Sequence, residues 1–219
     1  MTSETSRPAI DITDRSSGGS HASTVSISQR QPNMHGKAQP TLFDPAAHSH
    51  LTPYLAGLQA QCITRDLMIG SFLPPLANDK LLNWWKDRIA ESRAGTRVII
   101  LLLNEAEPGA KVRGEDLVGV AMLATPHSET SPFRARVESL LVAAKYRQKG
   151  GSVALMNAIH GQATLKGKTL LMAETESGSI AEKVFKKLGY DEVGKVPRYS
   201  LNASGELKDG VFLYKTLNV

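Results

Sequence analysis

Apolar positions along the chain change their period several times, and each change marks an expected element. Leu81, Leu82, Trp85 and Ile89 recur at the three- and four-residue spacing that indicates an amphipathic helix. Short apolar runs bounded by glycine, proline or charged residues indicate strands. The expected helices cover 47–68, 78–92, 151–167 and 179–189, and the expected strands cover 22–31, 96–104, 116–125, 134–143, 168–174, 190–200 and 209–217. The order β-αα-βββ-α-β-α-ββ predicts a mixed α/β domain with a parallel strand pair, about six or seven strands in a mixed central sheet and about four flanking helices.

The ends of this pattern define the domain. Residues 1–20 are polar and without period, so we expect a disordered tail followed by one domain over 21–219. Residues 31–45 are punctuated by proline and glycine and are expected to form a loop. No apolar run reaches the roughly 18 residues that span a bilayer, and the N-terminus has no apolar signal region. One cysteine, Cys62, excludes an internal disulfide and a cysteine-built metal site. We expect a cytoplasmic protein, with the nucleus left open.

A modest basic excess, +5 overall, favours anionic partners. There is no run of five basic residues and no stripe of interleaved aromatic residues. Nucleic acid is therefore not required as a partner, and no membrane partner is expected.

A basic, glycine-rich turn stands between the strand at 134–143 and the helix at 151–167. Its residues are Arg147, Gln148, Lys149, Gly150, Gly151 and Ser152. Free N–H groups at a helix start, together with the helix dipole, form an anion site, and adjacent glycines allow close approach of a phosphate. The spacing fits neither a Walker A loop nor a dinucleotide fingerprint. The turn alone leaves two interpretations open: a phosphate site, or an ordinary loop with solvated basic residues.

This turn resembles motif A of the GNAT-type N-acetyltransferases, Arg/Gln-x-x-Gly-x-Gly/Ala, with Ser152 in the last place. The segment "SIAEKVFKKLGYDEVG" resembles the next motif of that family, a helix ending in Leu-Gly-Tyr/Phe. More narrowly, "RVESLLV", "AETESGSIAEKVF", "GKVPRYS" and "FLYKTL" resemble the tabtoxin-resistance acetyltransferases. The resemblance covers roughly 98–217 and implies the GNAT fold, with acetyl-CoA as co-substrate and no metal.

The resemblance also implies roles for individual residues. The backbone of Leu140, Leu141 and Val142 would bind the pantetheine arm of the coenzyme, and an N–H near Val142 would polarise the thioester carbonyl. The N–H groups of residues 147–152 would bind the pyrophosphate.

Acetyl transfer to an amine needs a proton acceptor, for which carboxylates on two strands are the candidates. Glu138 and Glu174 lie on strands that the resemblance places side by side at the cofactor cleft, where both would act in catalysis or bind the amine. The alternative is that Glu138 faces solvent. Phe185 stands where most of the family has tyrosine, so it would wall the cleft but could not protonate the departing thiolate. The thiolate would then take its proton from Tyr199 or from water, or it would need no acid. Tyr199 is also a candidate to contact the substrate.

We therefore expect direct acetyl transfer from acetyl-CoA to an amine of a small molecule, such as an amino-acid analogue, an antibiotic or toxin, or a polyamine. Such an activity would suit detoxification or resistance. A protein or histone lysine acetyltransferase and a non-catalytic acyl-CoA-binding module remain alternatives, and a nucleic-acid binder ranks last. Exposed strand edges near the C-terminus would allow a homodimer.

Overall fold

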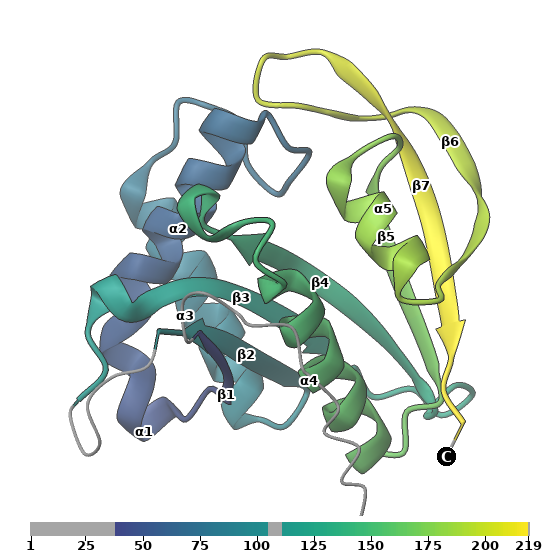
Figure 1. Ribbon diagram of the computed structural model, residues 1–219, viewed down its shortest axis with the longest axis horizontal. Coiled ribbons are helices and arrows are strands. Elements are labelled where there is room, and N and C mark those ends of the chain that lie inside the picture. Colours follow the sequence, from purple (N-terminus) through teal and green to yellow (C-terminus); the bar gives the residue numbers. More distant parts are fainter. Residues whose placement is uncertain (1–37, 105–110, 219) are drawn as a thin grey trace, which may run out of the picture. The chain divides into compact units, whose positions relative to one another are not determined.

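In the part of the chain that the structure describes, helices flank a seven-stranded mixed sheet (Figure 1). The computed structural model describes residues 38–104 and 111–218, which all fall in one compact unit. The strands are β1 (Gln39–Leu42), β2 (Arg97–Leu103), β3 (Leu117–Ala124), β4 (Arg134–Val142), β5 (Leu170–Glu176), β6 (Asp191–Leu201) and β7 (Leu207–Thr216). The α-helices are α1 (Pro45–His48), α2 (Thr52–Asp66), α3 (Asn78–Arg93), α4 (Gly151–Leu165) and α5 (Ile180–Lys187). Across the sheet the order is β1-β2-β3-β4-β5-β7-β6, and β4–β5 is the parallel pair. The predicted mixed α/β class is confirmed.

The N-terminal part of the prediction needs a correction. The expected tail at 1–20 and strand at 22–31 lie outside the described residues, so the boundary at residue 20 stays a prediction. Strand β1 lies inside the expected loop at 31–45 and pairs antiparallel with β2. The loop prediction was wrong here because Pro40 is compatible with an edge strand, where its missing N–H faces no partner strand. The helix expected at 47–68 is divided into α1, a short 3-10 turn and α2.

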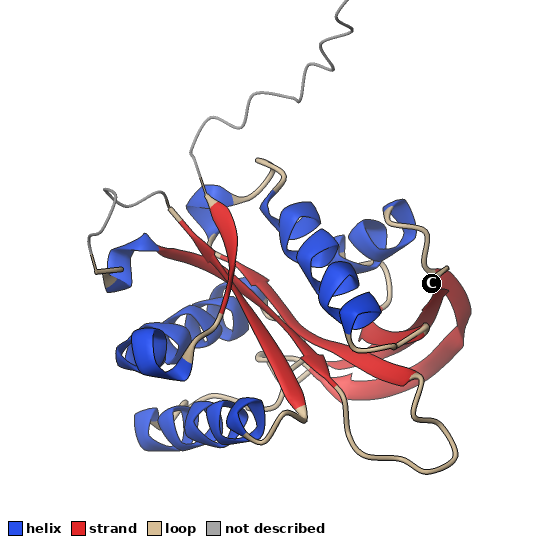
Figure 2. Cartoon of the chain, turned by 90° about the horizontal axis from the view of Figure 1, so that it is seen from below, coloured by secondary structure: helices blue, strands red, loops and turns tan. Residues whose placement is uncertain are grey.

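The two faces of the sheet are covered by different helices (Figure 2). One apolar cluster joins α2 and α3 to β2 and β3; Trp85 on α3 is fully buried there, on the face expected from its spacing. A second cluster joins α4 and α5 to the opposite face. All buried core residues of β5 and β7 belong to this second cluster: Leu171, Ala173, Val211 and Leu213. The β5–β7 part of the sheet is therefore not covered by α2 or α3, and this face is called the open face below.

Strands β4 and β5 pair over three positions and then separate. Residues Arg134–Arg136 lie beside Leu170–Met172, with no pairing beyond them. Figure 1 shows the two strands close together near the C-terminus and diverging from there. Strand β4 also carries a bulge against β3, where Ser139 has a φ of 51°. Just beyond the bulge Gly119 pairs with Val142, and a Cβ on Gly119 would sit 2.9 Å from the Leu141 carbonyl oxygen, so only glycine allows this approach.

Candidate active site

The divergence of β4 and β5 frees backbone groups of β4. Val142 lies opposite Gly119 of β3, and the next N–H, that of Ala143, donates to the Val118 oxygen over 2.9 Å. Neighbouring residues of a strand direct their N–H groups to opposite edges, so the Val142 N–H points away from β3 and toward the opening. The side chain of Leu141 is buried under α2 and α3, whereas Leu140 packs on the α4 side. The predicted pantetheine segment thus borders the opening.

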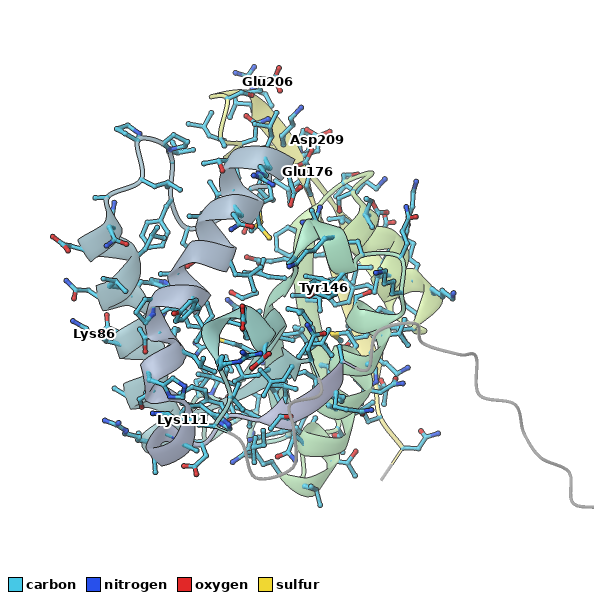
Figure 3. The ribbon with its side chains drawn as sticks, turned by 60° about the vertical axis from the view of Figure 1, so that its left-hand side comes forward. Lys86, Lys111, Tyr146, Glu176, Glu206 and Asp209 are labelled. Atoms are coloured by element: carbon cyan, nitrogen blue, oxygen red, sulfur yellow. The ribbon has the colours of Figure 1, made fainter. Side chains whose placement is uncertain are left out.

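The turn from β4 into α4 presents a second group of donors. Gly150 precedes the helix with a φ of 83°, and no side chain caps the helix start. The N–H groups of residues 148–152 meet no acceptor within the ranges that the structure describes. Tyr146, which is labelled in Figure 3, lies just before this turn. The Lys149 ammonium lies 5.6 Å from the centre of the Tyr146 ring, and the Tyr146 hydroxyl accepts a hydrogen bond from Asn104 over 2.9 Å. Free N–H groups and a nearby cation fit an anionic phosphate.

Arg147 differs from the rest of the turn. Its N–H donates to the Ala144 oxygen, and its Nε donates to the Val142 oxygen over 2.8 Å. Its Nη1 donates to Asp66 at the end of α2, also over 2.8 Å. The hydrogen bond to Asp66 raises the pKa of Arg147. The guanidinium therefore ties the turn to α2, and the predicted contact of the Arg147 N–H with the pyrophosphate stays a prediction.

Glu138 and Glu174 stand on the two sides of the opening. The last paired residues are Arg136 and Met172, and both carboxylates follow two positions later on their strands. Residues two apart on a strand share a face, so both side chains lie on the side opposite α4, where the open face begins. Glu174 is exposed. The structure thus places the two selected carboxylates on the same face of neighbouring strands, each two residues beyond the last pair.

Glu138 is held by a buried arginine. Arg97 Nη1 donates to Glu138 Oε2 over 2.7 Å, and Arg97 Nε donates to Glu91 Oε2 over 2.6 Å. The Arg97 side chain is 7% exposed and that of Glu138 29%, so this carboxylate does not simply face solvent. Burial alone would raise the pKa of Glu91, but the hydrogen bonds and charges of Arg97 and Arg88 hold it below its ordinary value. One oxygen of Glu138 is fixed, and Oε1 has no protein partner within the described residues.

Tyr199 lies on the open face near Glu174. Its ring packs edge-on against Phe212 of β7, with 5.2 Å between ring centres, and Phe212 is the partner of Glu174 across β5 and β7. Partial burial and then the Glu174 carboxylate raise the pKa of the Tyr199 phenol, whereas the charge of Arg136 opposes this shift. Tyr199 is therefore placed beside one of the predicted carboxylates.

Phe185 belongs to the core beneath α4 and α5. Its side chain is 4% exposed and packs edge-on against Tyr190 at 5.1 Å between ring centres. The Tyr190 hydroxyl lies 3.1 Å from His160 Nε2, and burial raises the pKa of Tyr190. The Tyr190 phenol is buried in the same cluster and so is not placed to serve as the missing acid. The contact of Phe185 with a cofactor stays a prediction.

Two residues of the site escaped the sequence analysis, Arg97 and Arg136. The alternation of "RARVESLLV" carried a signal for Arg136, because it places this residue on the same face as Glu138. No local signal links Arg97 to Glu138, which lies 41 residues away along the chain. Within residues 38–104 and 111–218 no group of three or more histidine, cysteine or acidic residues could hold a metal ion. No helix of the same ranges is long and apolar enough to cross a membrane.

An opened parallel strand pair with free donors at a helix start fits a phosphorylated co-substrate, and comparison gives the family. The profile of the acetyltransferase (GNAT) family matches residues 75–190, more than half of the chain. The chain therefore belongs to the GNAT acetyltransferase family, whose members use acetyl-CoA, and the predicted enzyme class and co-substrate are confirmed at that level.

Solved structures of low sequence identity share the fold. One is yncA of Salmonella typhimurium, assigned as an acetyltransferase and solved with its cofactor acetyl-CoA (18% identity, TM-score 0.62, covering 83% of this chain and 95% of that one). Another is a ribosomal-protein-alanine N-acetyltransferase of Brucella melitensis (19%, 0.61, 81% and 99%). A third is assigned as a phosphinothricin N-acetyltransferase (19%, 0.63, 83% and 99%). These likenesses confirm the predicted GNAT fold, and the different acceptors in the last two names show that the fold alone does not select one.

Proposed function

We propose that the protein transfers the acetyl group of acetyl-CoA directly to a primary or secondary amine of a small molecule. The observation that carries this proposal is the pair Glu138 and Glu174 at the mouth of the β4–β5 opening, on the face away from α4. The free donors of the turn and of Val142 border the same opening. Donor site and proton acceptors thus converge where two strands part.

The chain's own groups fit the coenzyme. The free N–H groups of residues 148–152 would hold its pyrophosphate, and the backbone of residues 140–142 would hold the pantetheine arm. When bound, acetyl-CoA supplies an activated acetyl thioester. The Val142 N–H would donate to the thioester carbonyl oxygen, a contact of the kind that contributes about 2.7–4 kcal/mol to acyl transfer.

Glu138 would take the proton of the acceptor ammonium, directly or through one water. Its Oε2 is occupied by Arg97, which fixes the side chain and leaves Oε1 for this task. The amine nitrogen would then bond to the acetyl carbon as the carbon–sulfur bond breaks, and the second proton of the nitrogen would pass through water to the departing thiolate. Glu174 would hold the ammonium from the other side. Direct transfer is preferred because Cys62 is buried and burial raises its pKa to about 11, so it is no nucleophile.

The volume of a pocket beside β6 supports a small molecule as the acceptor. A pocket of about 240 Å³ lies between the α2–α3 loop and β6; its lining residues are Gly70, Ser71, Phe72, Leu73, Ser200 and Leu201. Ser200 directly follows Tyr199 along β6, so this pocket adjoins the strand that carries the candidate substrate residue. Its volume is below the range of about 300–1,000 Å³ typical for drug-sized ligands, as suits an amino-acid analogue or a small toxin. A role in detoxification or resistance would follow from such an acceptor.

The test is release of free thiol from acetyl-CoA across a panel of amino acids and their analogues, polyamines and a histone-tail peptide. We expect turnover of a small amine, and a Glu138→Gln, Glu174→Gln double variant is expected to lose at least about 100-fold in kcat while CoA binding, followed by calorimetry, is retained. The matched control is Glu129→Gln, the same change in the exposed β3–β4 loop, which should behave as the wild type.

Two results would contradict the proposal. Turnover confined to the peptide would identify a protein acetyltransferase. Tight CoA binding without thiol release for any acceptor would identify a binding module, for which the loss of the tyrosine at Phe185 would then be the explanation.

A further inference from the structure

The open face carries a cation that the proposed chemistry does not use. Arg136 lies on β4 beside Met172, at the last paired position before β4 and β5 diverge, and its side chain is exposed. Arg97 and Arg147 are each held by a carboxylate. Arg136, in contrast, forms no ion pair with any residue that the structure describes.

The position of Arg136 relative to the two carboxylates is set by the strands. Arg136 and Glu138 are two residues apart on β4, so their side chains leave the same face with Cα atoms about 6.6 Å apart. Glu174 occupies the corresponding place on β5, two residues beyond Met172. Glu138 directs its Oε2 to Arg97 and not to Arg136.

Aromatic side chains of β6 and β7 continue this face. Tyr199 and Phe212 pack edge-on, and Tyr199 lies close enough for the charges of both Glu174 and Arg136 to act on its phenol. No buried residue of β5–β7 belongs to the cluster under α2 and α3, so no helix core fills the space above them. The open face therefore carries three kinds of group. These are the carboxylates of Glu138 and Glu174, the Arg136 guanidinium, and the aromatic rings of Tyr199 and Phe212.

We infer that the acceptor is a zwitterion, an amine with a carboxylate a few bonds away, and that Arg136 binds this carboxylate while Glu138 and Glu174 face the ammonium. A guanidinium matches a carboxylate through two parallel hydrogen bonds. A polyamine would instead place a second cation against Arg136. The inference rests on the proposed function and adds the substrate class and a specificity-determining residue to it.

The experiment compares matched acceptors that differ at the carboxylate alone. The panel holds amino acids with their carboxamides and decarboxylated amines; L-methionine, L-methioninamide and 3-(methylthio)propylamine form one such set. We expect at least one free acid to be acetylated with a kcat/KM about tenfold or more above both of its matched partners. Arg136→Gln should raise the KM for that acid about 10- to 100-fold, the loss expected for a charge-assisted hydrogen bond.

The variants separate recognition from damage to the fold. In Arg136→Gln the KM for acetyl-CoA and the KM for the carboxamide should not change, and Arg136→Lys should restore part of the affinity for the acid. Arg134→Gln removes the same charge from an exposed residue two positions earlier on the strand and should leave the KM for the acid unchanged.

Each contrary outcome has its own meaning. Amides and plain amines acetylated as well as the acids would overturn the inference while the proposed function stands. An equal loss on acid and carboxamide in Arg136→Gln would also overturn it, because it would show a structural effect. Turnover of no amine at all would overturn both the inference and the proposed function.

Discussion

The contact between Arg97 and Glu138 makes a quantitative prediction about how the proposed proton acceptor is held. Arg97 Nη1 and Glu138 Oε2 are 2.7 Å apart, with exposed side-chain fractions of 7% and 29%. Two unit charges about 4 Å apart at an effective dielectric constant of 20 attract by about 4 kcal/mol. Desolvation of the buried guanidinium offsets part of this, which leaves a net coupling of about 1.5–3 kcal/mol, the usual range for a hydrogen bond to a charged group.

The perturbation is a double-mutant cycle with Arg97→Gln, Glu138→Gln and both changes together. Urea unfolding gives the free energy of unfolding for each protein, since the cycle isolates the pairwise energy from the separate effect of each substitution. Each single variant should lose about 2–3 kcal/mol, and the double variant should lose less than their sum by the coupling energy. The control cycle uses Arg113 and Glu115, a pair 2.9 Å apart with side chains 71% and 67% exposed.

The control pair should couple by no more than about 1 kcal/mol, because exposed ion pairs are screened by water. Arg97 does not hold Glu138 if the two couple no more strongly than this exposed pair. The same conclusion follows if the effects of the two substitutions on the free energy of unfolding add within about 0.5 kcal/mol. The proposal that Oε1 is presented to the amine by a fixed side chain would then lose its support.

Three further predictions concern other parts of the molecule. Burial and the Lys215 charge lower the pKa of His160 from 6.5 to about 4, so its contribution to stability is complete above pH 6.5 and declines as the pH falls toward 4. Urea unfolding at pH 7.5 and 5 should show about 2 kcal/mol of loss from this group in the wild type and none of it in His160→Gln. Gly119→Ala should cost about 1–3 kcal/mol in thermal unfolding, since its Cβ would lie 2.9 Å from a backbone oxygen, whereas Gly161→Ala in open space should gain about 0.5–1 kcal/mol. Burial raises the pKa of Cys62 to about 11, so at pH 8 a disulfide reagent should modify it slowly in the folded protein and rapidly in urea; fast modification of the folded protein would contradict its burial.

Local patterns predicted most of the fold. Helical spacing in 78–92 gave α3 within a residue at its end, and the glycine-rich turn marked the junction of β4 and α4. Both depend on interactions between residues close together in the chain, such as helical hydrogen bonds and positive φ at glycine. Strand β1 was missed because its proline resembles a loop signal, and only pairing with β2 makes it a strand.

The parts of the site that escaped prediction depend on contacts between distant segments. Arg147 meets Asp66 across 81 residues, and this ion pair engages the side chain of the first residue of the predicted phosphate turn. The composition of the turn could not show it, because α2 and the turn become neighbours only in the folded sheet. The burial of Phe185 has the same origin, because the core cluster that covers it joins α4 and α5 to β5 and β7.

The bulge at Ser139 explains how one strand supplies both a proton acceptor and a backbone donor. Val137 and Val142 both belong to the cluster on the α4 side, although in a regular strand residues an odd number of positions apart face opposite sides. One extra residue in β4, at the bulge, puts both valines on the same face. The bulge includes Ser139, whose φ is 51°, and no glycine in the sequence indicates this positive φ. Before the bulge Glu138 faces the acceptor side with Arg97; after it the Val142 N–H faces the opening rather than β3. If β4 alternated regularly through this segment, the Val142 N–H would point to β3 while Glu138 faced the acceptor side. The convergence of these two groups at the opening therefore depends on the one extra residue in β4.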